Sequence, residues 1–302
     1  MLKKGLSLQG GGVLGAAQAG MLYQGFETDP QFAEQTHPGD VWKTIAGTSI
    51  GALNGLMIAL GYSAREMFDI WFNAEKEDLV RGRWKKWKSI YTREPMEIFI
   101  EKLINKKFDM NDMSFSVLHG LTGVNLICIA TIVQTGKPLF MGKDYYNCNV
   151  KEAIMMSTAF PLAFDPISYI NPIDNEEYQI IDGGTLMNSP ILPLVKEQCD
   201  DITVLSVGGV PEKFKFTGIM SLKNLFEFIT LGNEYISLSW ASHFIEDLKI
   251  YHCECKNIST FDWGKTKELI KQGISAWDIG PVKIARIENA MKKSGENLLE
   301  ML

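Results

Sequence analysis

The segment that most constrains the fold of this chain is Gly47-Thr48-Ser49-Ile50-Gly51, which joins a predicted strand to a predicted helix. Residues 41–46 have the pattern of a short buried strand, and residues 52–60 are small and apolar, as a packed helix requires. A serine at such a turn, with glycine two residues to either side, forms a nucleophile elbow. We expect a strained backbone at Ser49 and no room for side chains at positions 47 and 51. The alternative is a glycine-rich packing turn without catalytic function.

Strand and helix patterns alternate along the rest of the chain. Strands are predicted at residues 5–9, 124–133, 139–141, 178–182, 202–207 and 249–255. Helices are predicted at residues 13–26, 150–159, 222–248 and 265–302, and residues 62–119 are expected to be mostly helical without a clear strand. This alternation predicts a three-layer α/β/α sandwich with a mainly parallel central sheet. No linker is evident, so we expect residues 1–302 to form a single domain, with its core at residues 5–210 and a mostly helical part at residues 211–302.

Composition limits the classes of function. The 302 residues carry a net charge of -6, which argues against a general nucleic-acid binder. The five cysteines are odd in number and scattered through apolar segments, which indicates reduced thiols and a cytoplasmic protein. No run reaches the roughly 18 apolar residues that span a bilayer, so we expect any membrane contact to be peripheral. Ala17-Gln18-Ala19 resembles a signal-peptidase site, but the glycines at 10–15 favour a strand, a loop and a helix over a signal peptide.

The first predicted strand runs into a second glycine-rich segment, Gly10-Gly11-Gly12-Val13-Leu14-Gly15, which precedes a helix. This is formally the G-x-G-x-x-G fingerprint of dinucleotide-binding proteins, which also needs an acidic residue at the end of the second strand. Here the second strand ends in the serine turn, and Asp29 precedes that strand. The other uses of such a loop are a plain turn or an oxyanion hole, in which backbone N–H groups point into a cleft. Because the first two strands are expected to be neighbours, the loop and Ser49 would share one edge of the sheet.

An attacking serine needs a base. The chain has four histidines, which are His37, His119, His243 and His252. The order Ser49, Asp182 and a later histidine matches an α/β-hydrolase triad, but that fold places several strands before its nucleophile, and here one strand precedes it. His252 alternates with its neighbours in a predicted strand and is expected to face solvent. We therefore do not expect a histidine base.

Asp182 is the better candidate for the base. It ends a predicted strand, and Gly183 and Gly184 leave room for another loop to approach closely. A carboxylate near the reference pKa of about 3.9 is a weak base, but burial raises its pKa and its basicity. Taken alone, Asp-Gly-Gly is also a common turn. The catalytic interpretation gains weight because two other loops are expected at the same edge.

Together these three segments resemble the motifs of the patatin-like phospholipases, in the same order along the chain. Met156-Ser157-Thr158-Ala159-Phe160-Pro161 is similar to a further block of that family, and the resemblance covers about residues 5–210. It implies calcium-independent hydrolysis of phospholipids or other lipid esters by a Ser49–Asp182 dyad, with no histidine and no cofactor. It also implies an oxyanion hole formed by Gly10, Gly11, Gly12 and Val13, with Gly15, Gly47, Gly51, Gly183 and Gly184 supporting the loops.

Leu14 departs from the family pattern, which usually has Arg or Lys at this position. Loss of a cation there weakens the stabilisation of an oxyanion or phosphate, whereas the backbone donors remain. We therefore expect a lipid acyl hydrolase with altered rate or substrate preference. Two alternatives stay open: a catalytically weak lipid-binding scaffold of the same fold, and a nucleotide-binding oxidoreductase that uses residues 10–15.

Residues 81–93 carry six basic residues and no acidic one, in a chain that is acidic overall. Lysine and arginine attract anionic headgroups, and tryptophan settles at the membrane boundary. The candidates for contact with an anionic membrane are Arg83, Trp84, Lys85, Lys86, Trp87 and Lys88. The alternative is a solvated basic face with the two tryptophans packed on the core.

Overall fold

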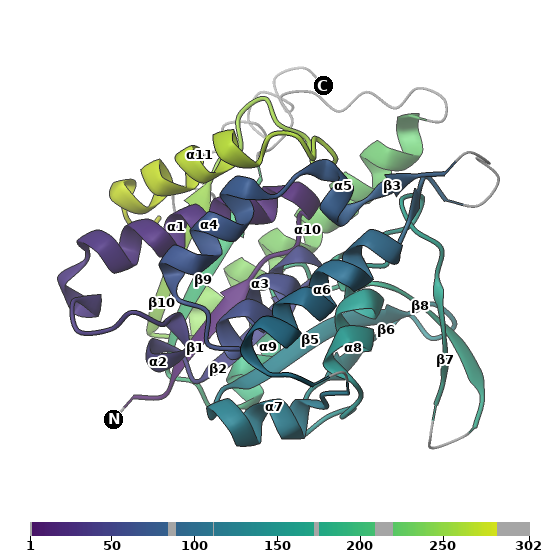
Figure 1. The fold of residues 1–302 in the computed structure, drawn as a ribbon, viewed down its shortest axis with the longest axis horizontal. Helices are drawn as coiled ribbons and strands as arrows, with labels where there is room; N and C mark the ends of the chain where they lie inside the picture. Colours follow the sequence, from purple (N-terminus) through teal and green to yellow (C-terminus); the bar gives the residue numbers. More distant parts are fainter. Residues whose placement is uncertain (1, 84–88, 111, 172–174, 209–219, 283–302) are drawn as a thin grey trace.

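The computed structural model describes residues 2–83, 89–110, 112–171, 175–208 and 220–282. Its main sheet has eight strands in the order β10-β9-β1-β2-β5-β8-β7, with β6 also paired to β5 (Figure 1). The strands are β1 (Lys4–Leu8), β2 (Thr44–Thr48), β5 (Asn125–Ile132), β6 (Lys137–Met141), β7 (Ile167–Ile170), β8 (Glu177–Asp182), β9 (Asp201–Val207) and β10 (Asp247–Cys253). The five strands from β10 to β5 are parallel, whereas β6 and β8 run antiparallel to β5, and β7 runs antiparallel to β8.

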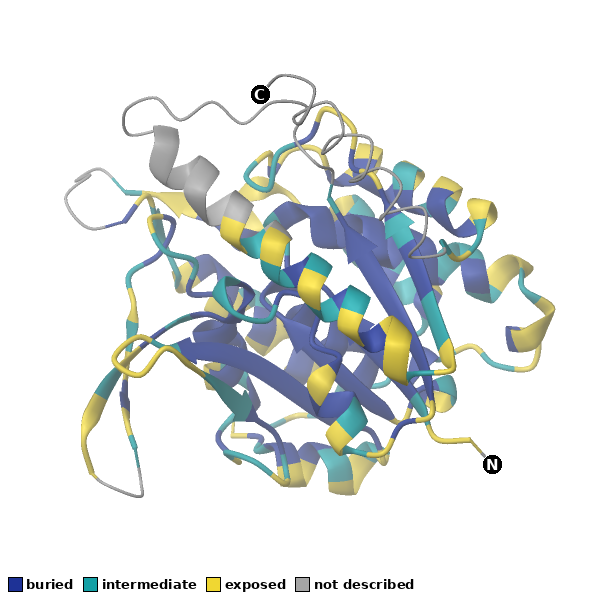
Figure 2. Ribbon diagram, turned by 180° about the vertical axis from the view of Figure 1, so that it is seen from behind, coloured by how far each residue is buried: buried dark blue, intermediate teal, exposed yellow. Residues whose placement is uncertain are grey.

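Helices cover both faces of this sheet (Figures 1 and 2). One face packs against α1 (Gly15–Thr28), α3 (Ile50–Ala59), α4 (Ala64–Asn73), α6 (Glu94–Lys107), α8 (Val150–Ser157) and α11 (Thr266–Ile279). The other face packs against α9 (Leu192–Lys196) and α10 (Met220–Phe244). The described α-helices also include the short α2 (Pro38–Val41), α5 (Lys76–Leu79) and α7 (Phe115–Thr122), and the described 3-10 helices are η1 (Gly12–Leu14), η2 (Pro30–Phe32) and η3 (Gly183–Thr185). The predicted three-layer arrangement is therefore confirmed.

Successive side chains of each strand point to opposite faces of the sheet, which divides the apolar side chains between two cores. In β5, Leu126 and Cys128 belong to the larger core, whereas Ile127 and Ile129 belong to the smaller core on the other face. A strand buried on both faces has no polar side to present, which explains the nearly continuous apolar run seen in the sequence. The same division makes α3 a buried helix, with all ten of its residues buried.

The register of the strands brings the predicted loops to one edge of the sheet. β1 lies beside β2, with Leu8 opposite Gly47, as the sequence predicts for the first two strands. β8 approaches β5 from the opposite direction and ends with Asp182 opposite Ala130. Since β5 pairs Ile129 with Thr48 of β2, the end of β8 lies level with the serine turn. Three chain segments far apart in sequence therefore meet at this edge.

Some predicted elements differ from the structure. The prediction of no strand within residues 62–119 is wrong, because β3 (Arg81–Gly82) and β4 (Tyr91–Thr92) pair as a small antiparallel hairpin. Two-residue strands have no periodicity from which they could be predicted. β7 was also not predicted, and the last predicted helix ends at Ile279, with residues 283–302 outside the described residues. That residues 1–302 form a single domain stays a prediction.

Candidate active site

Ser49 occupies a strained turn between β2 and α3. Its backbone has φ 56° and ψ -125°, in the region that favours glycine. A Cβ atom at Gly47 would lie 2.4 Å from the Gly51 carbonyl oxygen, and one at Gly51 would lie 2.2 Å from the Leu8 carbonyl oxygen. The predicted strain and crowding are therefore confirmed. The turn presents Ser49 at the N-terminus of α3, where the helix dipole favours negative charge.

Ser157, in the block that resembles a further family motif, holds this turn. The Ser49 N–H donates to Ser157 Oγ at 2.8 Å, and Ser157 Oγ donates to the Ile129 carbonyl at 2.5 Å. Two residues later, the Ala159 carbonyl accepts a hydrogen bond from the Asp182 N–H at 2.9 Å. The block thus connects the serine turn to the end of β8. The sequence alone indicated this block only through its resemblance, without a role for Ser157.

Asp182 is buried beside Ser49, with 2% of its surface exposed. Its Oδ1 accepts a hydrogen bond from the Gly184 N–H at 2.7 Å, whereas its buried Oδ2 has no partner of ordinary hydrogen-bond geometry among the described residues. Burial raises the pKa of Asp182 to about 6, although interactions with the Ser49 side chain and the Gly184 amide act to lower it. The Ser49 side chain is thus close enough to Asp182 to affect the pKa of that carboxyl, without forming a hydrogen bond of ordinary geometry.

The glycine-rich loop lies against Ser49, and part of it is already hydrogen-bonded. A Cβ atom at Gly10 would lie 3.2 Å from the Ser49 Cβ. The Gly10 N–H donates to the Asn188 carbonyl at 3.1 Å, and the Val13 N–H donates to the Thr260 carbonyl at 3.1 Å. Within the described part of the chain, the Gly11 and Gly12 amides have no such acceptor. Of the four amides expected to form an oxyanion hole, these two have no backbone acceptor among the described residues.

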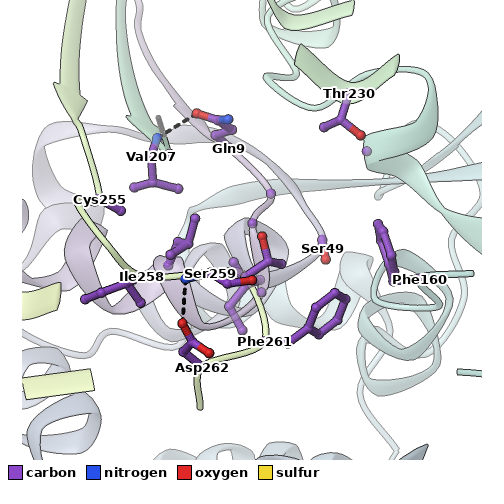
Figure 3. A pocket seen from close by; sticks show the side chains of 18 of the residues that line it. Gln9, Ser49, Phe160, Val207, Thr230, Cys255, Ile258, Ser259, Phe261 and Asp262 are labelled. Carbon is purple, nitrogen blue, oxygen red and sulfur yellow. Dashed lines mark hydrogen bonds between the residues drawn. The ribbon is translucent and has the colours of Figure 1, made fainter. Parts of the chain in front are cut away.

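Ser49, Asp182 and residues 10–12 line one cavity of about 920 Å³. Figure 3 shows this cavity with Ser49 labelled. One of its walls is the segment 254–263, which follows β10 and carries no motif that we could predict. Its Thr260 carbonyl lies so close to Gly12, which has φ 57°, that a Cβ atom there would approach it to 2.5 Å. Apolar and aromatic side chains line much of the cavity, and they are Leu14, Ile50, Met96, Phe160, Phe164, Val207, Ile258, Phe261 and Trp263.

Charged groups are few in this cavity. Besides Asp182, its lining includes Glu254, Lys256 and Asp262, and the Lys256 ammonium lies 3.8 Å from the Glu254 carboxylate. Leu14 is 6% exposed and adds an apolar surface where the family usually has a cation. Across the residues that the structure describes, no group of three histidine, cysteine, aspartate or glutamate side chains is placed to hold a metal ion.

None of the four histidines, all of which are described, lines the cavity. The prediction that His252 faces solvent is wrong. Its ring is partly buried, and Nδ1 lies 2.9 Å from Ser206 Oγ. His243 is exposed on α10, with Nδ1 2.7 Å from the Ser239 carbonyl. A base near Ser49 therefore has to be sought among the carboxylates.

Of the candidate membrane contacts, Trp84, Lys85, Lys86, Trp87 and Lys88 lie outside the described residues. Arg83 is described, and its guanidinium pairs with the Asp165 carboxylate at 2.6 Å. The β3–β4 hairpin is joined to the cavity wall, because the Tyr91 N–H donates to the Ala163 carbonyl at 2.9 Å, next to Phe164. Among the described residues, no helix combines the length and the apolar character needed to cross a membrane.

A sequence profile described as patatin-like phospholipase matches residues 6–195 of this chain. The match covers well over half of the chain and includes the glycine-rich loop, the serine turn and Asp182. The chain therefore belongs to the patatin-like phospholipase family.

Individual relatives are similar at moderate identity. A cGAMP-activated phospholipase of Escherichia coli (strain TW11681) is 29% identical over 244 residues, which cover 70% of this chain and 63% of that protein. The uncharacterized protein YqhO of Bacillus subtilis is 30% identical over 209 residues, or 63% of this chain and 66% of the relative. An uncharacterized mimivirus protein, R571, is 28% identical over 196 residues, or 62% and 60%. The chain thus spans less than two thirds of the length of these relatives.

Solved structures with a similar fold include the crystal structure of VipD from Legionella pneumophila. The TM-score is 0.49 at 14% identity, over 92% of this chain and 67% of that one.

Proposed function

We propose that this protein is a serine-dependent lipid acyl hydrolase that cleaves carboxylic esters with Ser49 and Asp182. The observation that carries this proposal is a cavity lined by a strained serine, a buried carboxylate and two glycines whose amides have no backbone acceptor among the described residues. Membership of the patatin-like phospholipase family supports the same class of reaction. The nucleotide-binding alternative loses support, because β2 ends in the serine turn and offers no carboxylate for a ribose.

In the proposed reaction, Asp182 takes the proton of the Ser49 hydroxyl as its oxygen attacks the ester carbonyl carbon. Burial favours this step, because a pKa of about 6 makes the carboxylate a stronger base than an exposed aspartate. The bond to the alcohol then breaks, and Asp182 returns the proton to the leaving oxygen. An acyl ester on Ser49 remains, and a water molecule activated by Asp182 hydrolyses it.

The oxyanion that forms on the ester carbonyl would accept hydrogen bonds from Gly11 and Gly12. Each such donor is worth about 3 kcal/mol in comparable sites. The Gly10 and Val13 amides contribute indirectly, since their bonds to Asn188 and Thr260 hold the loop at both ends. The loop therefore has a fixed shape before substrate binds, which is the condition for electrostatic stabilisation without reorganisation.

The cavity wall favours an acyl chain as the part of the substrate that it encloses. Phe160 and Phe261 meet edge to face with ring centroids 5.6 Å apart, and both line the cavity close to Ser49 (Figure 3). Met96 and Phe164 extend the same apolar surface. An apolar lining of this kind binds hydrocarbon by removing it from water. We infer that the acyl group lies here and that the alcohol part of the ester points toward the polar residues.

A lipid hydrolysis panel with a serine-reactive probe tests the proposed function. We expect the purified protein to release fatty acid from phospholipid or acylglycerol esters in the presence of EDTA, because no step uses a metal ion. A fluorophosphonate should label Ser49, and mass spectrometry of the labelled peptide locates the adduct. A protein that binds lipid vesicles but takes no label supports the scaffold alternative. Saturable binding of NAD without labelling supports the oxidoreductase alternative.

We also propose that residues 81–93 bring the protein to anionic membranes. The β3–β4 hairpin is anchored beside Phe164, so a membrane held by this segment would lie next to the cavity. Replacing Trp84 and Trp87 together with alanine should weaken sedimentation with anionic vesicles by about tenfold, with little effect on zwitterionic vesicles. Trp240→Ala, at an exposed tryptophan on α10, is the matched control. Binding that depends neither on lipid charge nor on these two tryptophans excludes the proposal.

A further inference from the structure

Glu234 is a buried carboxylate that the Ser49–Asp182 chemistry does not use. It lies on α10, is 7% exposed, and follows by one turn Thr230, which lines the cavity (Figure 3). Its Oε2 accepts a hydrogen bond from Gln9 Nε2 at 2.6 Å, and its Oε1 accepts one from Ser206 Oγ at 2.9 Å. A buried carboxylate is unfavourable unless such partners compensate it, so this polar site is built into the fold.

Gln9 is the residue immediately before the glycine-rich loop, and all of its polar groups are bonded. Its N–H donates to the Leu205 carbonyl at 3.2 Å, and its carbonyl accepts from Gln18 Nε2 at 2.8 Å. Its side-chain oxygen accepts from the Val207 N–H at 2.6 Å (Figure 3). Glu234 supplies the acceptor for the remaining group, Nε2. It thereby completes the set of bonds that fix how the chain enters the loop.

The same carboxylate interacts with the other anchor of the loop. The Asn188 side chain lies beside Glu234 and acts to lower the pKa of that carboxyl. The Asn188 carbonyl accepts the hydrogen bond from the Gly10 N–H at 3.1 Å. Glu234 therefore holds Gln9, the residue before Gly10, and lies beside Asn188, which accepts from Gly10. These contacts join α10 to the ends of β1 and β9 and to the segment after Asp182.

We propose that Glu234 is a positioning residue for the oxyanion loop, and that it acts through Gln9 on the direction of the Gly11 and Gly12 amides. The inference rests on the proposed function, since it assigns Glu234 a part in the same reaction. The ionised carboxylate is the competent form, because a hydrogen bond to an ionised acceptor is about twice as strong as a neutral one.

The hydrogen-bond network allows two protonation states without movement of the backbone. Gln9 Nε2 can only donate, so Oε2 must stay an acceptor, and the proton of the acid form belongs on Oε1, facing Ser206. The Ser206 hydroxyl donates to the ionised carboxylate. When Glu234 is protonated, the hydroxyl turns and donates to His252 Nδ1, which lies 2.9 Å away. Protonation thus weakens the hold on Gln9 and leaves the fold intact.

The surroundings of Glu234 place its change of protonation state near neutral pH. Burial raises the pKa of Glu234 to about 7, although hydrogen bonds from neighbouring side chains act to lower it. Four titratable groups lie around Glu234. His252 contacts the same Ser206 hydroxyl as Glu234, and Glu254 lies on the far side of His252. Asp182 lies on the far side of Asn188, and Tyr235 is the next residue on α10. β1 and β9 add none at this end within the described residues. Burial lowers the pKa of His252, which keeps that ring neutral where Glu234 titrates.

Glu234→Gln tests the inference, because its carbonyl can still accept from Gln9 and its NH2 group can face Ser206, as in the protonated state. The substrate is the ester that wild type hydrolyses fastest in the lipid panel, at saturating concentration. At pH 8 we expect kcat to fall about tenfold with KM unchanged. The midpoint of kcat against pH should move from about 7 to about 6, where Asp182 alone controls the rate. Glu246→Gln, at an exposed position beyond α10, is the control and should retain both values.

Each other outcome has a distinct meaning. A wild type that hydrolyses no ester overturns the proposed function and this inference with it. A wild type that does hydrolyse, beside a Glu234→Gln variant with unchanged kcat and midpoint, overturns the inference alone. A lower kcat with an unmoved midpoint shows a merely structural role and also overturns it. If Glu234→Gln does not fold, Gln9→Met replaces it, with the same expected loss of kcat and shift of midpoint.

Discussion

Replacing Ser49 with alanine is expected to reduce ester hydrolysis by about 10⁴-fold or more, into the uncatalysed background. The substitution removes the hydroxyl that would carry the acyl group, and no neighbouring hydroxyl in the turn can replace it, since Thr48 Oγ1 donates to the Met187 carbonyl at 2.8 Å. Alanine has the same backbone restrictions as serine, and the Ser49 N–H keeps its bond to Ser157. The measurement is fatty acid release from the preferred ester, alongside thermal unfolding of the purified variant.

The matched control for this variant is Ser275→Ala. Ser275 is exposed on α11, and its Oγ bonds only locally to the Lys271 carbonyl, so both activity and stability should stay at wild-type values. Ser49→Ala should unfold near the wild-type temperature, because the lost hydroxyl makes no fully formed hydrogen bond that the fold needs. A Ser49→Ala protein that folds and still hydrolyses within about tenfold of the wild-type rate contradicts Ser49 as the nucleophile.

The elements that could be predicted from the sequence are those whose geometry depends on a few consecutive residues. The serine turn is the clearest example, because the close approaches at Gly47 and Gly51 are imposed by a strand–turn–helix connection that those five residues encode. The position of Asp182, at the end of a strand and before two glycines, could likewise be predicted from a few consecutive residues. The adjacency of β1 and β2 then followed from the rules of parallel sheets.

The parts that could not be predicted depend on contacts between distant segments. The sequence does not indicate that the Thr260 carbonyl accepts from the Val13 N–H, or that the Asn188 carbonyl accepts from the Gly10 N–H. None of the four loop amides could therefore be preferred over the others as an oxyanion donor. Glu234 was missed for the same reason, since its partner Gln9 is 225 positions away in the chain. His252 was placed in solvent because an alternating strand pattern does not show whether a helix covers its polar face.

Replacing Asp182 with asparagine is expected to lower kcat by about 10³-fold, the loss of a general base. Asparagine keeps the oxygen that accepts from Gly184 at 2.7 Å, so the shape of the site is preserved. The residual activity should lose the rise with pH near 6 that belongs to Asp182, because the wild-type base is active only when ionised. Asp247→Asn, at the exposed start of β10, is the control. Wild-type kcat in Asp182→Asn excludes Asp182 as the base.

The same variant should be more stable than wild type above pH 6, although its activity is much lower. Burial raises the pKa of Asp182 to about 6, so the folded protein binds a proton that the unfolded chain, with a pKa near 3.9, has already released. The wild type therefore loses stability as pH rises from about 4 to about 6, by about 3 kcal/mol in total, whereas asparagine has no proton to lose. Thermal unfolding at pH 8 and at pH 4 measures this difference, which should be present at the first pH and nearly absent at the second. If the Asp182→Asn variant is less stable than wild type at pH 8, the ionised carboxylate stabilises the fold. Asp182 would then lack the raised pKa, and so the greater basicity, that the reaction requires.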